Sequence, residues 1–344
     1  MKTKRPTPQR LPSGTWRCQV MVSGTRVSVT DEDREICQAK AMAIQAGLLE
    51  KEEKKKALTL EEAIDGYLES KSDVLSPSTV RGYEFVKRKR FPSLMKQNIW
   101  TITQKDVQTA VNQEARTKVS AKTIENGYGL VRPVLKMYGI DVSGVKLPQQ
   151  VIRRKKYVQK DEIETLIDAA RGDSCELQIL LALWLGLRRS EIMGLHWDCV
   201  DPKAGRLVIR RKLVMDKENR FVLIEGAKTV KSQRRVSCPA YIMDKLEARR
   251  HGRTEGPVFT QHPDTVRQHI HAICRKTGIT DTSTHGLRHT NAAVMNDLGV
   301  SDAHAMERGG WSEERTYKAT YSYVFESTAK EEDALVDEFF ASKT

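Results

Sequence analysis

Apolar and polar residues alternate near the start of the chain. Over residues 15–22 the even-numbered positions are apolar, and Ser23-Gly24 then offers a turn into residues 25–29. This alternation predicts a β-hairpin with one polar face. From about residue 33 the apolar spacing becomes helical, and it ends in a run of charges at residues 50–56, which predicts a helix followed by a solvated linker. The first 56 residues are therefore predicted to form a small β-β-α module.

Helical spacing of apolar residues continues through the next part of the chain. It predicts four helices, each beginning beside a Ser or Thr that can cap free N–H groups, at residues 59–70, 78–91, 103–116 and 120–138. Residues 140–160 lack periodicity and contain a basic run. We therefore expect a helical domain over residues 57–144 and a basic linker over residues 145–156.

The C-terminal part mixes both patterns. Residues 175–185 form an apolar run long enough for a buried helix. Three β-like runs predict a small antiparallel sheet, at residues 206–214, 220–224 and 234–238. Further helices are expected around this sheet, at residues 161–171, 239–249, 264–276, 285–297 and 302–308. The expected fold class is multidomain and mainly α, with a mixed α/β domain over residues 157–344 that ends in an amphipathic tail.

Composition narrows the class of protein. The chain has 344 residues and a mean hydropathy of −0.53, and it has no run approaching the roughly 18 apolar residues that a membrane span needs. No apolar segment follows the basic N-terminus, so we expect no secretory signal and a cytoplasmic location. The six cysteines are too scattered for a CxxC metal pair or a disulfide scaffold, and we expect reduced, mostly buried thiols.

The net charge of +13 is unevenly distributed. Basic and acidic residues number 12 and 7 over residues 1–56, 18 and 10 over residues 57–156, and 28 and 28 over residues 157–344. The N-terminal half therefore suits an anionic partner, with nucleic acid as the first candidate. Candidate DNA contacts lie on the hairpin, on the second predicted helix of the helical domain and in the linker, at Arg17, Gln19, Arg26, Arg81, Lys87, Arg88, Arg153 and Arg154. A plain structural hairpin is the alternative for the first three.

Scattered polar residues in the C-terminal part are candidates for chemistry. Arg188 begins a helix just after Gly186, and Lys228 lies in a turn between two strand-like runs. His285 and Arg288 are three residues apart and so share one helix face. Each signal is weak by itself, because such residues usually lie on a solvated surface.

Taken together, three stretches resemble the tyrosine recombinase (phage integrase) family. They are QILLALWLGLRRSEIMGLHWDCVD at residues 178–201, AKTVKSQRRVSCP at 227–239 and HGLRHT at 285–290. The resemblance implies two catalytic arginines, a lysine and a histidine, at Arg188, Arg288, Lys228 and His285. It also implies that Glu191 supports Arg188 and that His289 orients the site. Lys231 remains an alternative to Lys228, since the turn could shift by three residues.

The same resemblance implies a nucleophilic tyrosine. Trp311 stands where the family has His or, in fewer members, Trp, and the family tyrosine follows nine or ten residues later. Tyr321 lies ten residues beyond Trp311, whereas Tyr317 lies six and Tyr323 twelve residues beyond it. We therefore take Tyr321 as the candidate nucleophile, with Tyr317 and Tyr323 as alternatives.

The resemblance implies a site-specific recombinase that cuts and rejoins DNA through a 3′-phosphotyrosyl link, with no metal and no other cofactor. Its partners would be double-stranded DNA with core-type and arm-type attachment sites, bound by the helical domain and the N-terminal module respectively. It would act in the bacterial cytoplasm as a homotetramer, with an excision factor or a host DNA-bending protein as a further partner. Three rivals remain open: a chromosome-dimer resolvase, a type IB topoisomerase and a non-catalytic DNA-binding regulator.

Overall fold

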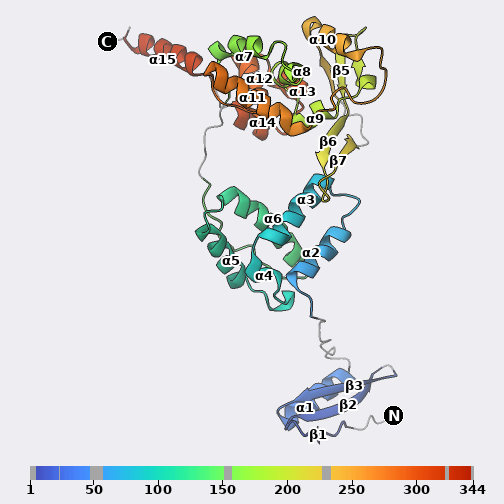
Figure 1. The fold of residues 1–344 in the computed structure, drawn as a ribbon. Helices are drawn as coiled ribbons and strands as arrows, with labels where there is room; N and C mark the ends of the chain where they lie inside the picture. Colours follow the sequence, from blue (N-terminus) through green and yellow to red (C-terminus); the bar gives the residue numbers. More distant parts are fainter. Residues whose placement is uncertain are drawn as a thin grey trace.

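The computed structural model describes residues 5–22, 24–46, 57–150, 157–226, 234–321 and 325–341. Figure 1 shows the chain running from an N-terminal sheet with one helix, through a helical part, into a larger part that mixes helices and strands. Separate clusters of buried apolar residues lie in each of these parts. The predicted division into domains and its boundaries stay a prediction.

The N-terminal part consists of β1 (Gln9–Arg10), β2 (Trp16–Val22), β3 (Thr25–Asp31) and α1 (Arg34–Gln45), with the strands antiparallel in the order β1-β2-β3. Cys18 and Val20 on β2 are buried together with Cys37 and Ala41 of α1. Asp33 caps the helix, because its Oδ1 accepts hydrogen bonds from the backbone N–H groups of Glu35 and Ile36. The predicted β-β-α module is present, and the short β1 is an addition that the alternation did not predict.

The helical part contains α2 (Leu60–Glu69), α3 (Pro77–Lys89), α4 (Pro92–Met95), α5 (Gln104–Arg116) and α6 (Ala121–Met137). The four longer helices are those predicted, and Thr59, Ser76, Thr103 and Ser120 cap them. The sequence reasoning missed α4 because it extended the second helix to Phe91. Phe91 adopts a left-handed backbone conformation, with φ of 48°, and this turns the chain out of α3.

The C-terminal part is built around α8 (Glu176–Trp184), whose side chains are almost all buried and which packs against α12 (Thr284–Asp297). The other helices are α7 (Ile163–Ala170), α9 (Arg189–Met193), α10 (Ala240–Arg250), α11 (Pro263–Thr277), α13 (Asp302–Gly309), α14 (Glu314–Tyr321) and α15 (Glu326–Ala341). All six cysteines of the chain are buried and free of disulfides, as expected.

The strands of the C-terminal part form two sheets where one was predicted. One sheet has the order β4-β5-β8, from β4 (Val200–Asp201), β5 (Arg206–Ile209) and β8 (Arg234–Ser237), and the other is a hairpin of β6 (Arg211–Met215) and β7 (Phe221–Glu225). The predicted first run is thus split at Arg210. Arg210 and Arg211 both form ion pairs with Asp198, which holds the chain at this corner. Asp198 lies 12 residues before Arg210, in the short 3-10 helix Trp197–Cys199, so the alternation within residues 206–214 could not reveal the split.

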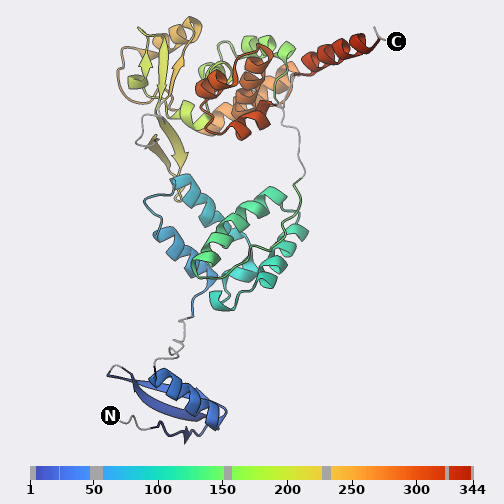
Figure 2. The same ribbon diagram turned by 180° about the vertical axis from the view of Figure 1, so that it is seen from behind.

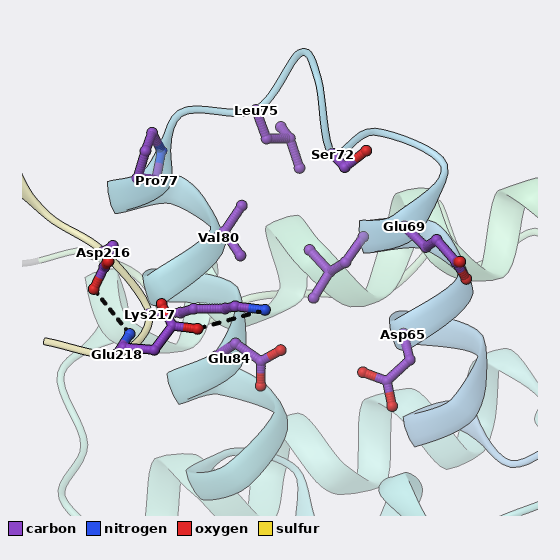
Figure 3. A pocket seen from close by; sticks show the side chains of 11 residues that line it. Asp65, Glu69, Ser72, Leu75, Pro77, Val80, Glu84, Asp216, Lys217 and Glu218 are labelled. Atoms are coloured by element: carbon purple, nitrogen blue, oxygen red, sulfur yellow. Dashed lines mark hydrogen bonds and ion pairs between the residues drawn. The ribbon is translucent and has the colours of Figure 1, made fainter. Parts of the chain in front are cut away.

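The β6–β7 hairpin extends from the C-terminal part to α3 of the helical part, as both views of the ribbon show (Figures 1 and 2). Arg81 of α3 donates a hydrogen bond from Nε to Oδ1 of Asn219 at the hairpin tip, over 3.1 Å. Beside this bond lies a groove lined by α2, α3 and the tip, in which Lys217 extends among the carboxylates of Asp65, Glu69 and Glu84 (Figure 3). The two parts are therefore joined by this contact as well as by the chain.

Among the residues that the structure describes, no helix combines the length and the apolar character that a membrane crossing requires.

Candidate active site

Arg188 lies at the N-terminal end of α9, where Gly186 turns the chain out of α8. Gly186 has a φ of +63°, and a Cβ there would lie 2.6 Å from Oδ1 of Asn291, so this turn requires glycine. Glu191, one turn along α9, accepts hydrogen bonds from the backbone N–H of Arg188 at 2.9 Å and from its Nη1 at 2.7 Å. The remaining fork nitrogen, Nη2, donates to the carbonyl of Gly310 at 2.7 Å. Glu191 and the turn after α13 thus orient Arg188.

Arg288 lies on α12 and is almost completely buried, with 1% of its surface exposed. Its Nη1 donates to the carbonyls of Gly186 and Gly309, both at 2.5 Å. Its Nη2 is buried and has no hydrogen-bond partner among the described residues. Burial, followed by the nearby charge of Arg188, lowers the pKa of Arg288 to about 9. A buried cation that lacks an anionic partner is suited to receive one.

Arg234, at the start of β8, is a site residue that the sequence reasoning missed. Its Nη1 and Nη2 donate to the two carboxylate oxygens of Glu191 at 3.0 and 2.7 Å, and its Nε donates to the carbonyl of Arg308 at 3.2 Å. One signal was available: Arg234 alternates with the buried Val236, while Arg235 is exposed. That alternation places Arg234 on the inner face of the strand.

Glu191 is the carboxylate that balances these cations. Burial alone would raise its pKa, but the hydrogen bonds and the charge of Arg234, together with the charge of Arg188, lower the pKa of Glu191 to about 2. Glu191 is therefore ionised at neutral pH.

The two histidines of the third motif lie on the first turns of α12. His285 is exposed and His289 is buried, and their rings meet edge to face with centroids 4.5 Å apart. His285 is thus on the accessible side of the helix that carries Arg288.

Trp311 follows the turn after α13 and lies over Arg288, with the guanidinium carbon 4.0 Å from the ring centroid. The indole also packs on Gly309, where a Cβ would lie only 1.7 Å from a ring carbon. Tyr317 of α14 meets the indole edge to face, with centroids 5.2 Å apart, and is fully buried. Burial also raises the pKa of Tyr317. Tyr317 is therefore a core residue in this structure.

Several predicted residues cannot be located in the site. Tyr321 is the last residue of α14, but its side chain is not described. The other positions fall outside the described residues, at Lys228, the alternative Lys231, Tyr323, and the linker residues Arg153 and Arg154. The roles of all of them stay predictions.

The candidate DNA contacts of the N-terminal part share one surface. Arg17, Gln19 and Arg26 lie on the outer face of the β2–β3 sheet, because Arg17 and Gln19 alternate with the buried Cys18 and Val20, and Arg26 pairs with Met21 of the same outer set. Such a face is open to a ligand.

The candidates on α3 are already engaged. Lys87 forms ion pairs with Asp65 at 2.5 Å and Glu84 at 3.2 Å, and 13% of its side chain is exposed. Arg88 donates from Nε to the carbonyl of Glu84, and Arg81 is bonded to Asn219 as described. A phosphate at Lys87 would have to displace carboxylates.

Asp173, Cys175 and His269 approach one another closely enough to be considered as a metal centre. However, both carboxylate oxygens of Asp173 contact Nδ1 of His269, at 2.8 and 2.9 Å, and one also accepts the backbone N–H of Cys175 at 2.7 Å. Burial raises the pKa of the Cys175 thiol, which keeps it protonated. These contacts describe a hydrogen-bonded turn that leads into α8 and a hydrogen bond between a carboxylate and a histidine.

Comparisons with known proteins identify the family to which the chain belongs. Residues 156–327 match the model of the phage integrase family, which is half of the chain. The chain therefore belongs to the phage integrase family, the tyrosine recombinases.

Individual relatives are distant. The integrase of Salmonella phage P22 is 24% identical over 202 residues, which cover 58% of this chain and 51% of that protein. The chain spans about half the length of the curated relatives it matches first.

Two solved structures share the fold. The Tn1549 transposon integrase in complex with transposon right-end DNA aligns with a TM-score of 0.64 and 15% identity, over 80% of this chain and 98% of that one. A lambda integrase tetramer bound to a Holliday junction aligns with a TM-score of 0.53 and 16% identity, over 92% and 95% of the two chains.

Proposed function

We propose that this protein is a site-specific DNA recombinase that integrates or excises a mobile element through a 3′-phosphotyrosyl intermediate. The observation that carries the proposal is the convergence of Arg188 and Arg288 on one turn, with Nη2 of Arg288 buried and lacking a partner among the described residues. Arg188 is paired with Glu191, whereas Arg288 has no anionic hydrogen-bond partner among the described residues, and a DNA phosphodiester would supply that anion. Fork-like donors suit its two non-bridging oxygens.

Charge development explains why the reaction needs these residues. The phosphodiester gains negative charge as an oxygen attacks, and a preorganised donor to that charge is worth about 3 kcal/mol. In the proposed mechanism Arg188 and Arg288 are these donors, and Tyr321 attacks phosphorus. Covalent attachment to the tyrosine conserves the energy of the phosphodiester bond for rejoining.

Proton transfer is the second requirement. A phenol has a pKa of about 10, so the rarity of the phenolate at neutral pH costs roughly 4 kcal/mol unless a base assists. We assign His285 to accept or relay this proton and Lys228 to protonate the leaving 5′-oxygen. Trp311 has an N–H donor and no exchangeable acid function, so its contribution is to packing and to one hydrogen bond.

A nicked duplex that carries the attachment site tests the proposal. Cleavage beside the nick releases a short strand, which prevents rejoining and traps the covalent complex. We expect a covalent protein–DNA product from the wild type, and its absence would favour the regulator. Recombination between two sites would separate a recombinase from a topoisomerase, whereas relaxation of supercoils alone would favour the topoisomerase.

We further propose that the N-terminal part binds arm-type sites and the helical part binds core-type sites. The support is the charge distribution, with the whole excess of +13 in residues 1–156, and the shared outer face of Arg17, Gln19 and Arg26.

A fragment that begins at residue 157 is expected to bind DNA weakly and to lose little more affinity as salt rises. The reason is that its 28 basic and 28 acidic residues cancel, so that few counterions are released on binding. Titrations of the fragment and of the full chain on one core-type duplex at several salt concentrations measure this. A steep salt dependence for the fragment would contradict the division of binding between the two halves.

We also propose that the protein acts as a tetramer in which α15 docks on a neighbouring copy. Leu335, Val336, Phe339 and Phe340 are each more than half exposed, and the helix projects from the C-terminal part (Figure 1). The lambda integrase structure is a tetramer on a Holliday junction, which supports an assembly of this size.

Deletion of residues 329–344 is expected to weaken the pairing of two DNA sites more than binding to one site. The deletion removes the apolar face that the partner copy would cover. Replacing Phe339 and Phe340 by Ser should act in the same direction, whereas Glu338→Ser on the other side of the helix should not. Gel-shift assays resolve single-site and paired complexes, and unchanged recombination by the truncated protein would count against the docking.

A further inference from the structure

Arg234 and Glu191 form a bidentate pair inside the C-terminal part. The two fork bonds measure 3.0 and 2.7 Å, and the side chains are only 13% and 10% exposed. Glu191 also accepts two hydrogen bonds from Arg188. Arg188 is therefore held by a carboxylate that is itself held by Arg234.

The pair also decides how much charge Arg188 can offer. If Glu191 were paired only with Arg188, its negative charge would cancel the positive charge that Arg188 would offer to the phosphate. With Arg234 present, Glu191 is shared between two guanidinium groups, and together with Arg288 the described residues of this cluster are three cations and one anion. The surplus matches a phosphate whose negative charge grows in the transition state.

Arg234 also contacts the end of α13, in the turn that leads to α14, the helix that carries Tyr317 and Tyr321. Three successive carbonyls there accept from three different arginines: that of Arg308 from Arg234, that of Gly309 from Arg288 and that of Gly310 from Arg188. A Cβ on Gly310, whose φ is +69°, would lie 2.5 Å from Nη1 of Arg234. Arg234 thus fits closely against the turn that leads to α14.

From these contacts we propose that Arg234 is a positioning residue for strand cleavage. It orients Arg188 through Glu191, leaves the charge of Arg188 available and fixes the turn at residues 308–310. The proposal rests on the proposed function, because it takes Arg188 as a phosphate ligand.

Single-turnover cleavage by the full chain at saturating protein tests the proposal. The probe is a nicked duplex copied from the junction between the mobile element and its host chromosome. Arg234→Met is expected to slow cleavage by about 10- to 100-fold, the loss typical of a group that orients a ligand-binding residue, while DNA affinity is unchanged. Arg234→Lys should recover part of the rate, because it restores the charge without the fork. The matched control is Arg235→Met, next to it on the exposed face of β8, which should cleave at the wild-type rate.

A double variant separates positioning from stability. Arg234→Met leaves Glu191 short of a partner and should lower the melting temperature, whereas Arg234→Met combined with Glu191→Gln removes both charges and should recover it. Cleavage by the double variant should stay slow. Its rate should match that of the slower of the two single variants, Arg234→Met and Glu191→Gln, because both changes act through Arg188. Recovery of the rate together with the melting temperature would overturn the proposal, as would a normal rate in Arg234→Met. Failure of the wild type to cleave would instead overturn the proposed function.

Discussion

Tyr321→Phe is expected to abolish the covalent protein–DNA product, whereas Tyr317→Phe should still form it. Phe lacks the hydroxyl that forms the phosphotyrosyl bond, so no residual covalent product is expected at the nucleophile position. Tyr317 is fully buried beside Trp311, and burial raises its pKa, which disfavours the phenolate. Denaturing gels with a labelled nicked duplex measure the product directly.

The alternatives remain distinguishable in the same assay. Covalent product from Tyr321→Phe would show that another tyrosine attacks, and Tyr323→Phe would then be the next variant. Both positions need a gel-shift control, since a variant that no longer binds the duplex says nothing about the nucleophile. Loss of product in Tyr317→Phe together with a lowered melting temperature would report on packing.

Arg188→Lys and Arg288→Lys are each expected to reduce the cleavage rate by about 10²- to 10³-fold, the usual cost of removing a preorganised donor. Lysine keeps the charge but cannot bond a carbonyl and a phosphate oxygen at the same time in the fork geometry. The loss should be at least as large for Arg288, because its Nη1 also joins Gly186 to Gly309.

Arg189→Lys is the matched control for this pair. Arg189 is adjacent to Arg188, is exposed and pairs with Asp264 at 2.9 Å. An exposed ion pair of this kind contributes little to stability, so the cleavage rate of Arg189→Lys should stay at the wild-type value. Single-turnover cleavage at saturating protein gives the comparison, and equal rates for Arg288→Lys and the wild type would contradict the phosphate role.

The helical part was predicted well because its signals are local. Thr59, Ser76, Thr103 and Ser120 each cap the helix that follows, and apolar spacing gave the buried faces. The end of α3 before Phe91 was missed although Pro92 disfavours a helical backbone at the residue before it, and only the left-handed conformation of the aromatic residue has no local signature.

The candidate site was predicted by resemblance in sequence motifs, and neither composition nor periodicity identified it. Arg188, His285 and Arg288 were named in this way, and the structure brings the two arginines to one turn. Arg234 was missed because its importance comes from Glu191, a residue 43 positions earlier in the chain. Contacts of that range depend on the packing of β8 against α9 and α13, which no local pattern encodes.

The contact between Arg81 and Asn219 bears on how the duplex of the proposed function would gain access to the protein. The chain tethers the helical part to the C-terminal part. If the tip of the β6–β7 hairpin leaves α3, each part therefore stays at a high effective concentration relative to the other. The contact includes one hydrogen bond from a charged group, which contributes only about 2 kcal/mol. Because Arg81 is also a predicted phosphate contact, a DNA phosphate would compete with Asn219 for the same guanidinium. Separation of the helical part from the hairpin tip would then exchange one partner of Arg81 for another. The free energy lost with the bond to Asn219 would be largely offset by the bond to the phosphate, and neither part would need to unfold.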